Sequence, residues 1–245
     1  MTGEILATGD EIRTGALIDR NSAHIARAMM DTGVDVVRHQ SIGDDLNGLV
    51  LILKEISQRA DVAVVTGGLG PTSDDRTAEA AAIAAGVDLV LDEEALSTVE
   101  AFFKVRKRKM SDTNRKQAFI PQGAECLSNP IGTACGFSLR IAKCRFFFLP
   151  GVPREMHRML AESVLPRISG LFDGIPTLFR VQTIATFGLP ESNTAERLSG
   201  FENEFPDIQL GLRAKFPEIQ IKLYARGRNE NDLKTGMAPA LEWVV

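Results

Sequence analysis

The sequence predicts an α/β protein in which a mainly parallel sheet lies between two layers of helices, followed by a small α+β domain. From Met1 to about Ser169, short apolar runs alternate with segments of helical periodicity, which is typical of βαβ units. Two of the runs, VAVV at 62–65 and FFFL at 146–149, are continuously apolar, as expected for strands covered on both faces. Beyond Ser169 the predicted order becomes β-α-β-β-α, which indicates a separate α+β domain.

The elements of the first domain follow from these patterns. Strands are predicted at Glu4–Thr8, Val34–His39, Asp61–Thr66 and Cys144–Leu149. Helices are predicted at Asn21–Thr32, Asp45–Gln58, Thr77–Ala85, Glu93–Arg108 and Pro153–Leu165. Gly33 and Gly86 directly follow two of these helices, in the position where glycine commonly ends a helix.

A domain boundary is predicted near 169–176, where Gly170, Gly174 and Pro176 interrupt the pattern. The sequence thus predicts domains at 1–169 and 170–245. In the second domain we expect strands at Thr177–Thr186, Ile208–Lys215 and Glu218–Ala225, and helices at Glu191–Ser199 and Asn231–Val245.

Composition limits the function classes. The chain has 245 residues, 44% of them apolar and 24% charged, as in ordinary globular proteins. A net charge of −4 argues against a generally basic nucleic-acid-binding surface, and no run of about 18 apolar residues predicts a membrane span. The odd number of cysteines, with no C-x-x-C pair, argues against a disulfide framework. We therefore expect a cytoplasmic protein with no nucleic-acid or membrane partner.

The strongest chemical signal is a glycine-rich turn between a predicted buried strand and a helix. Gly67, Gly68 and Gly70 allow the backbone to approach a ligand closely. The following helix would offer free N–H groups to an anion, at the strand end where open α/β sheets bind ligands. A tight turn in which Asp74, Asp75 and Thr77 only cap the helix is the alternative.

Two adjacent aspartates beside a phosphate site would repel the phosphate unless a cation compensates. Asp74 and Asp75 stand in that position, and carboxylates are the ligands that Mg²⁺ or Mn²⁺ prefers. The motif therefore predicts a divalent-metal site. In the alternative interpretation, one carboxylate binds a sugar or pterin and the other caps the helix.

TGGLGPTSDDRT at 66–77 resembles the signature of the CinA-type competence/damage-inducible proteins. Further blocks resemble that family in the same order: GDEI at 9–12 with Gly15, Asp19 and Asn21; SIGDD at 41–45; Asn114 with KQA at 116–118 and Pro121; NPIGTA at 129–134; and LPGVPREM at 149–156. Cys135 departs from the family, which usually has proline after G-T-A. The resemblance implies the MogA/MoaB-like molybdopterin-binding fold over about 1–168.

The resemblance also implies a metal-dependent ADP-ribose pyrophosphatase activity and assigns residues to it. Asp75 and Asp44 match the two aspartates of the motif, and with Asp74 they would hold the metal (Mg, Mn or Co) and activate water. The predicted phosphate-binding residues are Gly67, Gly68, Gly70, Thr72, Thr77, Asn21, Lys116, Gly151, Pro153 and Arg154. Asn21 could instead cap its helix, and for Glu155 a first-turn interaction with the helix dipole competes with metal ligation.

The C-terminal part resembles the KH-like domain of the same family through FGLPES at 187–192. KH domains that bind RNA use a G-x-x-G loop, and residues 170–245 contain none, so RNA binding is not expected. Longer family members carry a nicotinamide-nucleotide amidohydrolase domain after this one. Because the chain stops at Val245 without it, that activity is not expected, whereas a homodimer is.

Three functions remain open at this point. The first is hydrolysis of ADP-ribose or a related dinucleotide at the predicted metal site. The second is binding or transfer of molybdopterin, since the same pocket could hold a pterin phosphate and a fold alone does not decide function. The third is a non-catalytic partner module that uses the small domain for assembly.

Overall fold

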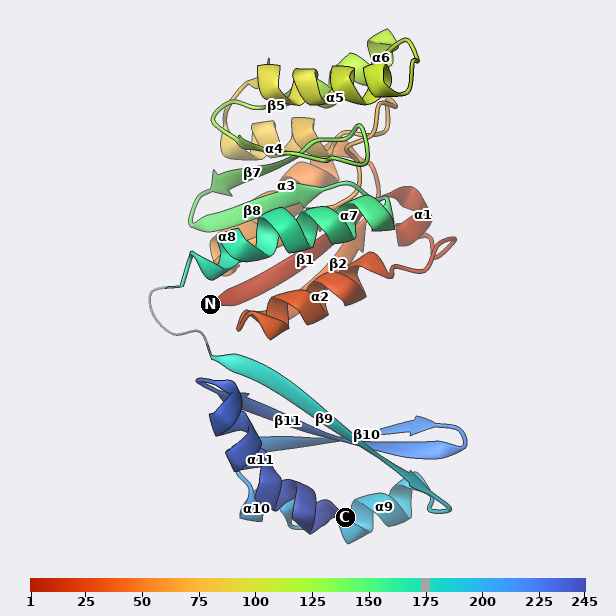
Figure 1. Ribbon diagram of the computed structural model, residues 1–245, viewed down its shortest axis with the longest axis vertical. Coiled ribbons are helices and arrows are strands. Elements are labelled where there is room, and N and C mark those ends of the chain that lie inside the picture. Colours follow the sequence, from red (N-terminus) through yellow and green to blue (C-terminus); the bar gives the residue numbers. More distant parts are fainter. Residues whose placement is uncertain (173–176) are drawn as a thin grey trace. The chain divides into compact units, whose positions relative to one another are not determined.

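The computed structural model describes residues 1–172 and 177–245, which form two compact units (Figure 1). The larger unit contains Met1–Met29 and Val34–Phe172; the smaller contains Met30–Gly33 and the described residues of Asp173–Val245. Gly174 and Pro176, which we used to predict the boundary, lie outside the described residues. The two units are treated separately below.

A six-stranded sheet forms the centre of the larger unit, in the order β2-β1-β3-β8-β7-β6. The strands are β1 (Thr2–Thr8), β2 (Asp35–Ile42), β3 (Val62–Thr66), β6 (Glu125–Leu127), β7 (Gly136–Ile141) and β8 (Cys144–Leu149). The first four strands in spatial order pair in parallel. The pairs β8–β7 and β7–β6 are antiparallel. The mainly parallel sheet is therefore confirmed. The sequence prediction missed β6 and β7. β6 is only three residues long. The turn between β7 and β8 contains Ala142 at φ 49°, a conformation that glycine or asparagine would have signalled in the sequence but alanine does not.

Helices cover both faces of this sheet, which confirms the three predicted layers. On one face, α3 (Leu46–Arg59) and α4 (Thr77–Ala85) pack on alternate strand residues such as Leu6, Val65 and Phe148. On the other, α2 (Asn21–Asp31) packs on the intervening residues together with a continuous helical segment made of α7 (Pro153–Met159), the π-helical turn Leu160–Val164 and α8 (Leu165–Ser169). Successive strand side chains point to opposite faces, so the apolar runs are buried on both.

The remaining elements of the larger unit are short, apart from one helix. They are α1 (Asp10–Arg13), α5 (Glu93–Val105), α6 (Asp112–Arg115), a 3₁₀ turn (Lys116–Ala118), and the pair β4 (Leu89–Leu91) and β5 (Phe119–Pro121). The helix predicted at Glu93–Arg108 ends three residues earlier, since Lys107 has φ 52°. Residues 104–109, of which all but Val105 are basic, have exposed side chains.

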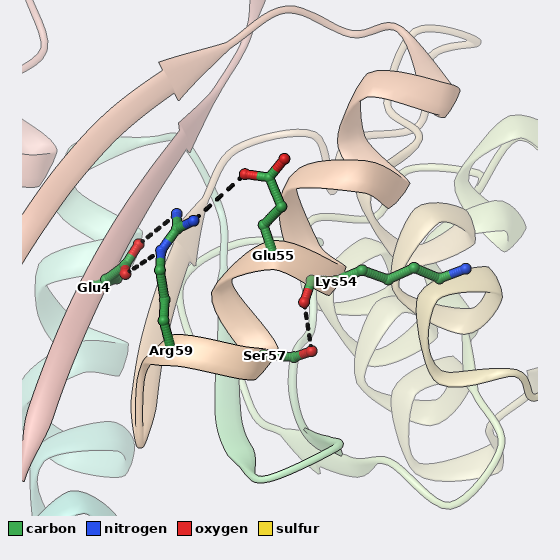
Figure 2. A network of polar contacts seen from close by, with 5 residues as sticks. All are labelled: Glu4, Lys54, Glu55, Ser57 and Arg59. Atoms are coloured by element: carbon green, nitrogen blue, oxygen red, sulfur yellow. Dashed lines mark hydrogen bonds and ion pairs between the residues drawn. The ribbon is translucent and has the colours of Figure 1, made fainter.

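A polar network ties the end of α3 to the central sheet (Figure 2). Glu4 on β1 is 1% exposed, and its carboxylate accepts hydrogen bonds from Arg59 Nε at 2.6 Å and Nη2 at 3.0 Å. Arg59 also contacts the exposed Glu55 one helical turn away, at 3.4 Å. A buried carboxylate is tolerated only when it is paired in this way, so Arg59 satisfies a charge that the sheet has buried.

The smaller unit is a three-stranded antiparallel sheet packed against helices. Its elements are β9 (Leu178–Phe187), α9 (Glu191–Arg197), α10 (Phe201–Glu204), β10 (Ile208–Lys215), β11 (Glu218–Gly227) and α11 (Glu230–Val244), and its strand order is β10-β11-β9. The predicted β-α-β-β-α order is present with one addition, the single-turn α10. No helix in the described part of the chain is long and apolar enough to cross a membrane.

Candidate functional site

A cavity of about 870 Å³ opens at the carboxyl ends of the parallel strands in the larger unit. Its wall is built from residues that follow β1, β2, β3 and β8 and from the first residues of α2 and α7. Loops at this edge are where open α/β sheets bind their ligands. Of the predicted site residues, those that line the cavity are Asn21, Asp44, Gly67, Gly68, Gly70, Asp74, Asp75, Gly151 and Pro153.

The glycine turn needs glycine for its own packing. Gly67 has φ 109° and Gly68 has φ 67°. A Cβ on Gly67 would lie 2.5 Å from the carbonyl oxygen of Thr8, and one on Gly68 would collide with the hydroxyl of Thr77. A Cβ on Gly70 would collide with the carboxylate of Asp75. The N–H of Gly67 donates to the carbonyl of Leu149 at 3.0 Å, so the backbone of Gly67 itself holds the turn in place.

Three predicted phosphate ligands instead form hydrogen bonds within the turn. The buried Thr77 donates from its hydroxyl to the carbonyl of Gly67 at 3.0 Å. Lys116 donates from Nζ to the carbonyl of Thr72 and to that of Asp75, the latter at 2.7 Å. Thr72 donates from its N–H and its hydroxyl to Asp75 Oδ2, at 2.9 and 2.6 Å. Thr72, Thr77 and Lys116 are not among the cavity-lining residues, so their observed contacts shape the loop.

The three predicted metal ligands all line the cavity but differ in their hydrogen bonds and surroundings. Asp44 follows β2, and its Oδ2 accepts the N–H of Asp10 at 3.1 Å. Burial raises the pKa of Asp44; the hydrogen bond from Asp10 opposes this, and the negative charges of Asp10, Glu11 and Asp74 add to it. The exposed Asp74 has its pKa lowered, first by the nearby polar side chain of Thr72, then by its own backbone N–H and by the positive charge of Lys116. Within the described residues, no three His, Cys, Asp or Glu side chains form a ready-made metal site.

Replacing Asp44 with asparagine is expected to stabilise the fold at neutral pH. The folded pKa of Asp44 is raised, so its ionisation costs stability as the pH rises through and above that pKa. Asparagine keeps an acceptor for Asp10 and removes the charge. The melting temperature of Asp44→Asn should therefore exceed that of the parent at pH 7, and the difference should shrink towards pH 3. An equal difference at both pH values would contradict the pKa assignment.

Asn21 joins the two helix N-termini at the cavity. Its Nδ2 donates to the carbonyl of Gly151 at 2.8 Å and to Thr66 Oγ1 at 3.3 Å. The interpretation that Asn21 caps α2 is wrong, because Asp19 accepts the N–H of Ser22 at 2.9 Å and fills that role. The Oδ1 atom of Asn21 is buried and has no hydrogen-bond partner among the described residues. Such an atom can accept a hydrogen bond from a bound ligand or water.

The start of α7 is fixed from the other side by the NPIGTA segment. Asn129 is buried; its Nδ2 donates to Glu155 Oε2 at 2.6 Å and to the carbonyl of Ala134 at 2.9 Å. Its Oδ1 accepts the N–H groups of Ile131 and Gly132. Glu155 therefore holds the loop that carries Thr133 and Ala134 into the cavity wall. The exposed Arg154 is not among the residues lining the cavity.

The apolar part of the wall had no sequence signal. Residues 16–20 line the cavity, and within them Leu17 is 56% and Ile18 is 73% exposed. Val152 across the cavity is 52% exposed. Apolar residues in a short loop do not differ from core residues in a sequence, so only the structure identifies an apolar rim beside the polar floor.

Comparisons with known proteins agree with this architecture. The family model described as a probable molybdopterin binding domain matches residues 4–170, and the model of the damage-inducible protein CinA KH domain matches residues 181–244. A CinA-like protein of Desulfosudis oleivorans is 45% identical over 244 residues, which is 100% of this chain and 59% of the relative. A CinA-like protein of Escherichia coli strain SE11 is 44% identical over 90% of this chain and 54% of the relative.

Among solved structures, the protein CinA from Thermoplasma acidophilum is similar, with a TM-score of 0.64 and 30% sequence identity. The match covers 69% of this chain and 99% of that one. The chain spans about 54–59% of the length of the two curated relatives above. On both domain matches, the chain belongs to the CinA-type proteins, with a molybdopterin-binding-type domain followed by a CinA KH domain.

Proposed function

We propose that the larger unit hydrolyses the pyrophosphate bond of ADP-ribose or a related dinucleotide with the help of a divalent cation. The observation that carries the proposal is that one cavity is lined both by a turn without side chains, at Gly67, Gly68 and Gly70, and by the carboxylates of Asp44 and Asp74. The first feature suits phosphate oxygens. The second suits the metal ion that accompanies them.

The size of the cavity supports a ligand larger than a single phosphate. Sites for small molecules and cofactors have volumes of roughly 300–1,000 Å³, and this one is about 870 Å³. The apolar rim at Leu17, Ile18 and Val152 can cover a flat ring, while the glycine turn holds the charged part. A dinucleotide has both parts.

The residues present fit a cation shared with the substrate. Mg²⁺ is usually held by one or two carboxylates together with substrate phosphates and water, so the lack of three converging protein ligands in the described structure is compatible with it. Asp44 and Asp74, with Asp75 behind them, would hold the ion. When bound, the ion would supply neutralisation of phosphoryl charge and a more acidic water.

The chain's own groups perform the remaining steps. The N–H groups of the turn beyond Gly67, and those at the α7 N-terminus, orient the phosphates; the N–H of Gly67 is bonded to Leu149. Asn21 Oδ1, which needs a donor, positions a ligand hydroxyl or water. Asp44 lines the cavity beside the glycine turn, and its carboxylate is the group we assign to accept the proton of the attacking water.

Incubation with ADP-ribose and Mg²⁺, Mn²⁺ or Co²⁺ should release AMP, and excess EDTA should stop the release. Asp44→Asn should lower the rate about 100-fold or more, since a general base contributes about 10²–10⁴-fold. Chromatography of the nucleotides measures both effects. Asp75→Ala should also abolish turnover, because it removes a predicted ligand and the acceptor for Thr72. Full turnover in EDTA would contradict the metal, and turnover at the parent rate in Asp44→Asn would contradict its role.

Binding of a pterin phosphate is the second candidate, and the molybdopterin-binding-type domain over 4–170 favours it. In that case, pterin should co-purify with the protein and no AMP should be released. We also propose the homodimer that the family resemblance implies, which light scattering on the purified chain would detect.

A further inference from the structure

The sheet of the smaller unit has one face packed against its helices and a second face with a different character. Leu223 and Ala225 on β11 are buried in the core that contains Phe201, Leu233 and Met237. Because strand side chains alternate, Lys222, Tyr224 and Arg226 belong to the opposite face. This second sheet face is turned away from the unit's own helices.

The strand register gathers its members from all three strands. Tyr224 pairs with Gln209 and Val181, and Lys222 pairs with Gly211 and Thr183. The complete second sheet face is Phe179, Val181, Thr183, Ala185 and Phe187 on β9; Glu218, Gln220, Lys222, Tyr224 and Arg226 on β11; and Gln209, Gly211, Arg213 and Lys215 on β10.

Two aromatic rings on this face, those of Tyr224 and Phe179, are neighbours. A Cβ added to Gly211 would be 3.0 Å from Tyr224 Cε2, so glycine leaves room for the ring to rest on the β10 backbone. The Phe179 ring neighbours that of Tyr224, with centroids 6.0 Å apart and ring planes at 28°. The guanidinium of Arg226 lies 6.0 Å from the Phe179 centroid. Neighbouring aromatic rings flanked by cations can form a platform on which planar groups stack.

Charge is separated between the two sides of the unit. Residues 177–245 contain nine acidic and eight basic residues. The second sheet face holds four of the basic residues, Arg213, Lys215, Lys222 and Arg226, and a single acidic one, Glu218, which forms an ion pair with Lys215 at 3.2 Å. The other eight acidic residues therefore lie off this face, and its cations are a local feature that the net charge of the chain conceals.

We propose that the second sheet face binds single-stranded nucleic acid without sequence preference. Phosphates would contact Lys222 and Arg213, and bases would stack on Tyr224 and Phe179. Proteins that bind single strands non-specifically combine these two features, a cationic track and aromatic side chains with accessible faces. The missing G-x-x-G motif does not bear on this surface, because that motif is a loop and this is a sheet face. The inference is independent of the pyrophosphatase proposal.

The test is fluorescence anisotropy of labelled 12-residue oligo(dT) and oligo(rU) with the full chain at several salt concentrations. We expect salt-dependent binding of both oligonucleotides. Tyr224→Ala should weaken binding about tenfold, within the range measured for loss of one base-stacking contact. Tyr224→Phe keeps the ring and should bind like the parent. Lys222→Glu should weaken binding and reduce the slope of log K against log salt by about one.

Lys234→Glu is the matched control, because it makes the same charge change on the exposed surface of α11. It should bind like the parent, and thermal melts should show that all variants fold. No binding at low salt, or equal losses in Lys222→Glu and Lys234→Glu, would overturn the proposal. A further contradicting result would be the absence of oligonucleotide binding together with a dimer that Tyr224→Ala dissociates. The face would then join two copies of the chain, which light scattering would detect.

Discussion

Replacing Gly67 with alanine is expected to abolish nucleotide binding and to destabilise the larger unit by about 3 kcal/mol or more. The new Cβ would lie 2.5 Å from the Thr8 carbonyl oxygen, and alanine is strongly disfavoured at φ 109°. Backbone strain of this kind costs of order 1–3 kcal/mol, and the collision adds to it. The turn must therefore move, and this displaces the glycine backbone that lines the cavity.

Gly86→Ala separates the collision from the cost of a left-handed backbone. Gly86 ends α4 with φ 71°, and a Cβ there would meet no atom within 4 Å. We expect this variant to lose only about 1–2 kcal/mol and to keep its affinity for ADP-ribose. Denaturant unfolding and calorimetric titration measure the two quantities. Equal effects of the two substitutions on affinity would show that the packing of Gly67 on Thr8 has no special importance for the site.

Replacing Arg59 with methionine is expected to reduce the free energy of unfolding by about 3 kcal/mol, at the lower end of the range for breaking a buried ion pair. The substitution keeps much of the side-chain volume but leaves the carboxylate of Glu4, 1% exposed, without its two hydrogen bonds (Figure 2). Arg59 itself is 32% exposed in its side chain, so water can reach part of the site and limits the loss.

Two further variants test this explanation. Glu55→Gln removes only the exposed arm of the network and should cost less than about 0.5 kcal/mol. The double variant Glu4→Gln/Arg59→Met should be more stable than Arg59→Met, since it no longer buries an unpaired charge. Urea unfolding of the full chain, followed by circular dichroism, measures each change. A double variant that is no more stable than the single one would place the cost in lost packing and not in the charge.

Most of the fold and part of the candidate site could be predicted from the local sequence pattern. The runs at 62–65 and 146–149 predicted strands buried on both faces, and Gly67, Gly68 and Gly70 marked the strand end at which the cavity opens. Both inferences depend on neighbours in the sequence, where spacing and residue type are sufficient. Asp44 was placed by resemblance to a family motif, and it also lines the cavity.

What the sequence determined by itself was the parallel strands with their long helices, the family and the glycine turn, because each follows from neighbouring residues. Only the tertiary structure decided that Thr77 and Lys116 bond to the turn, that Asp19 caps the helix in place of Asn21, and that rings and cations share a sheet face. Such assignments depend on which distant segments meet and in which register. Shifting a strand by one residue would reverse the face of every side chain, and no local pattern contains that information.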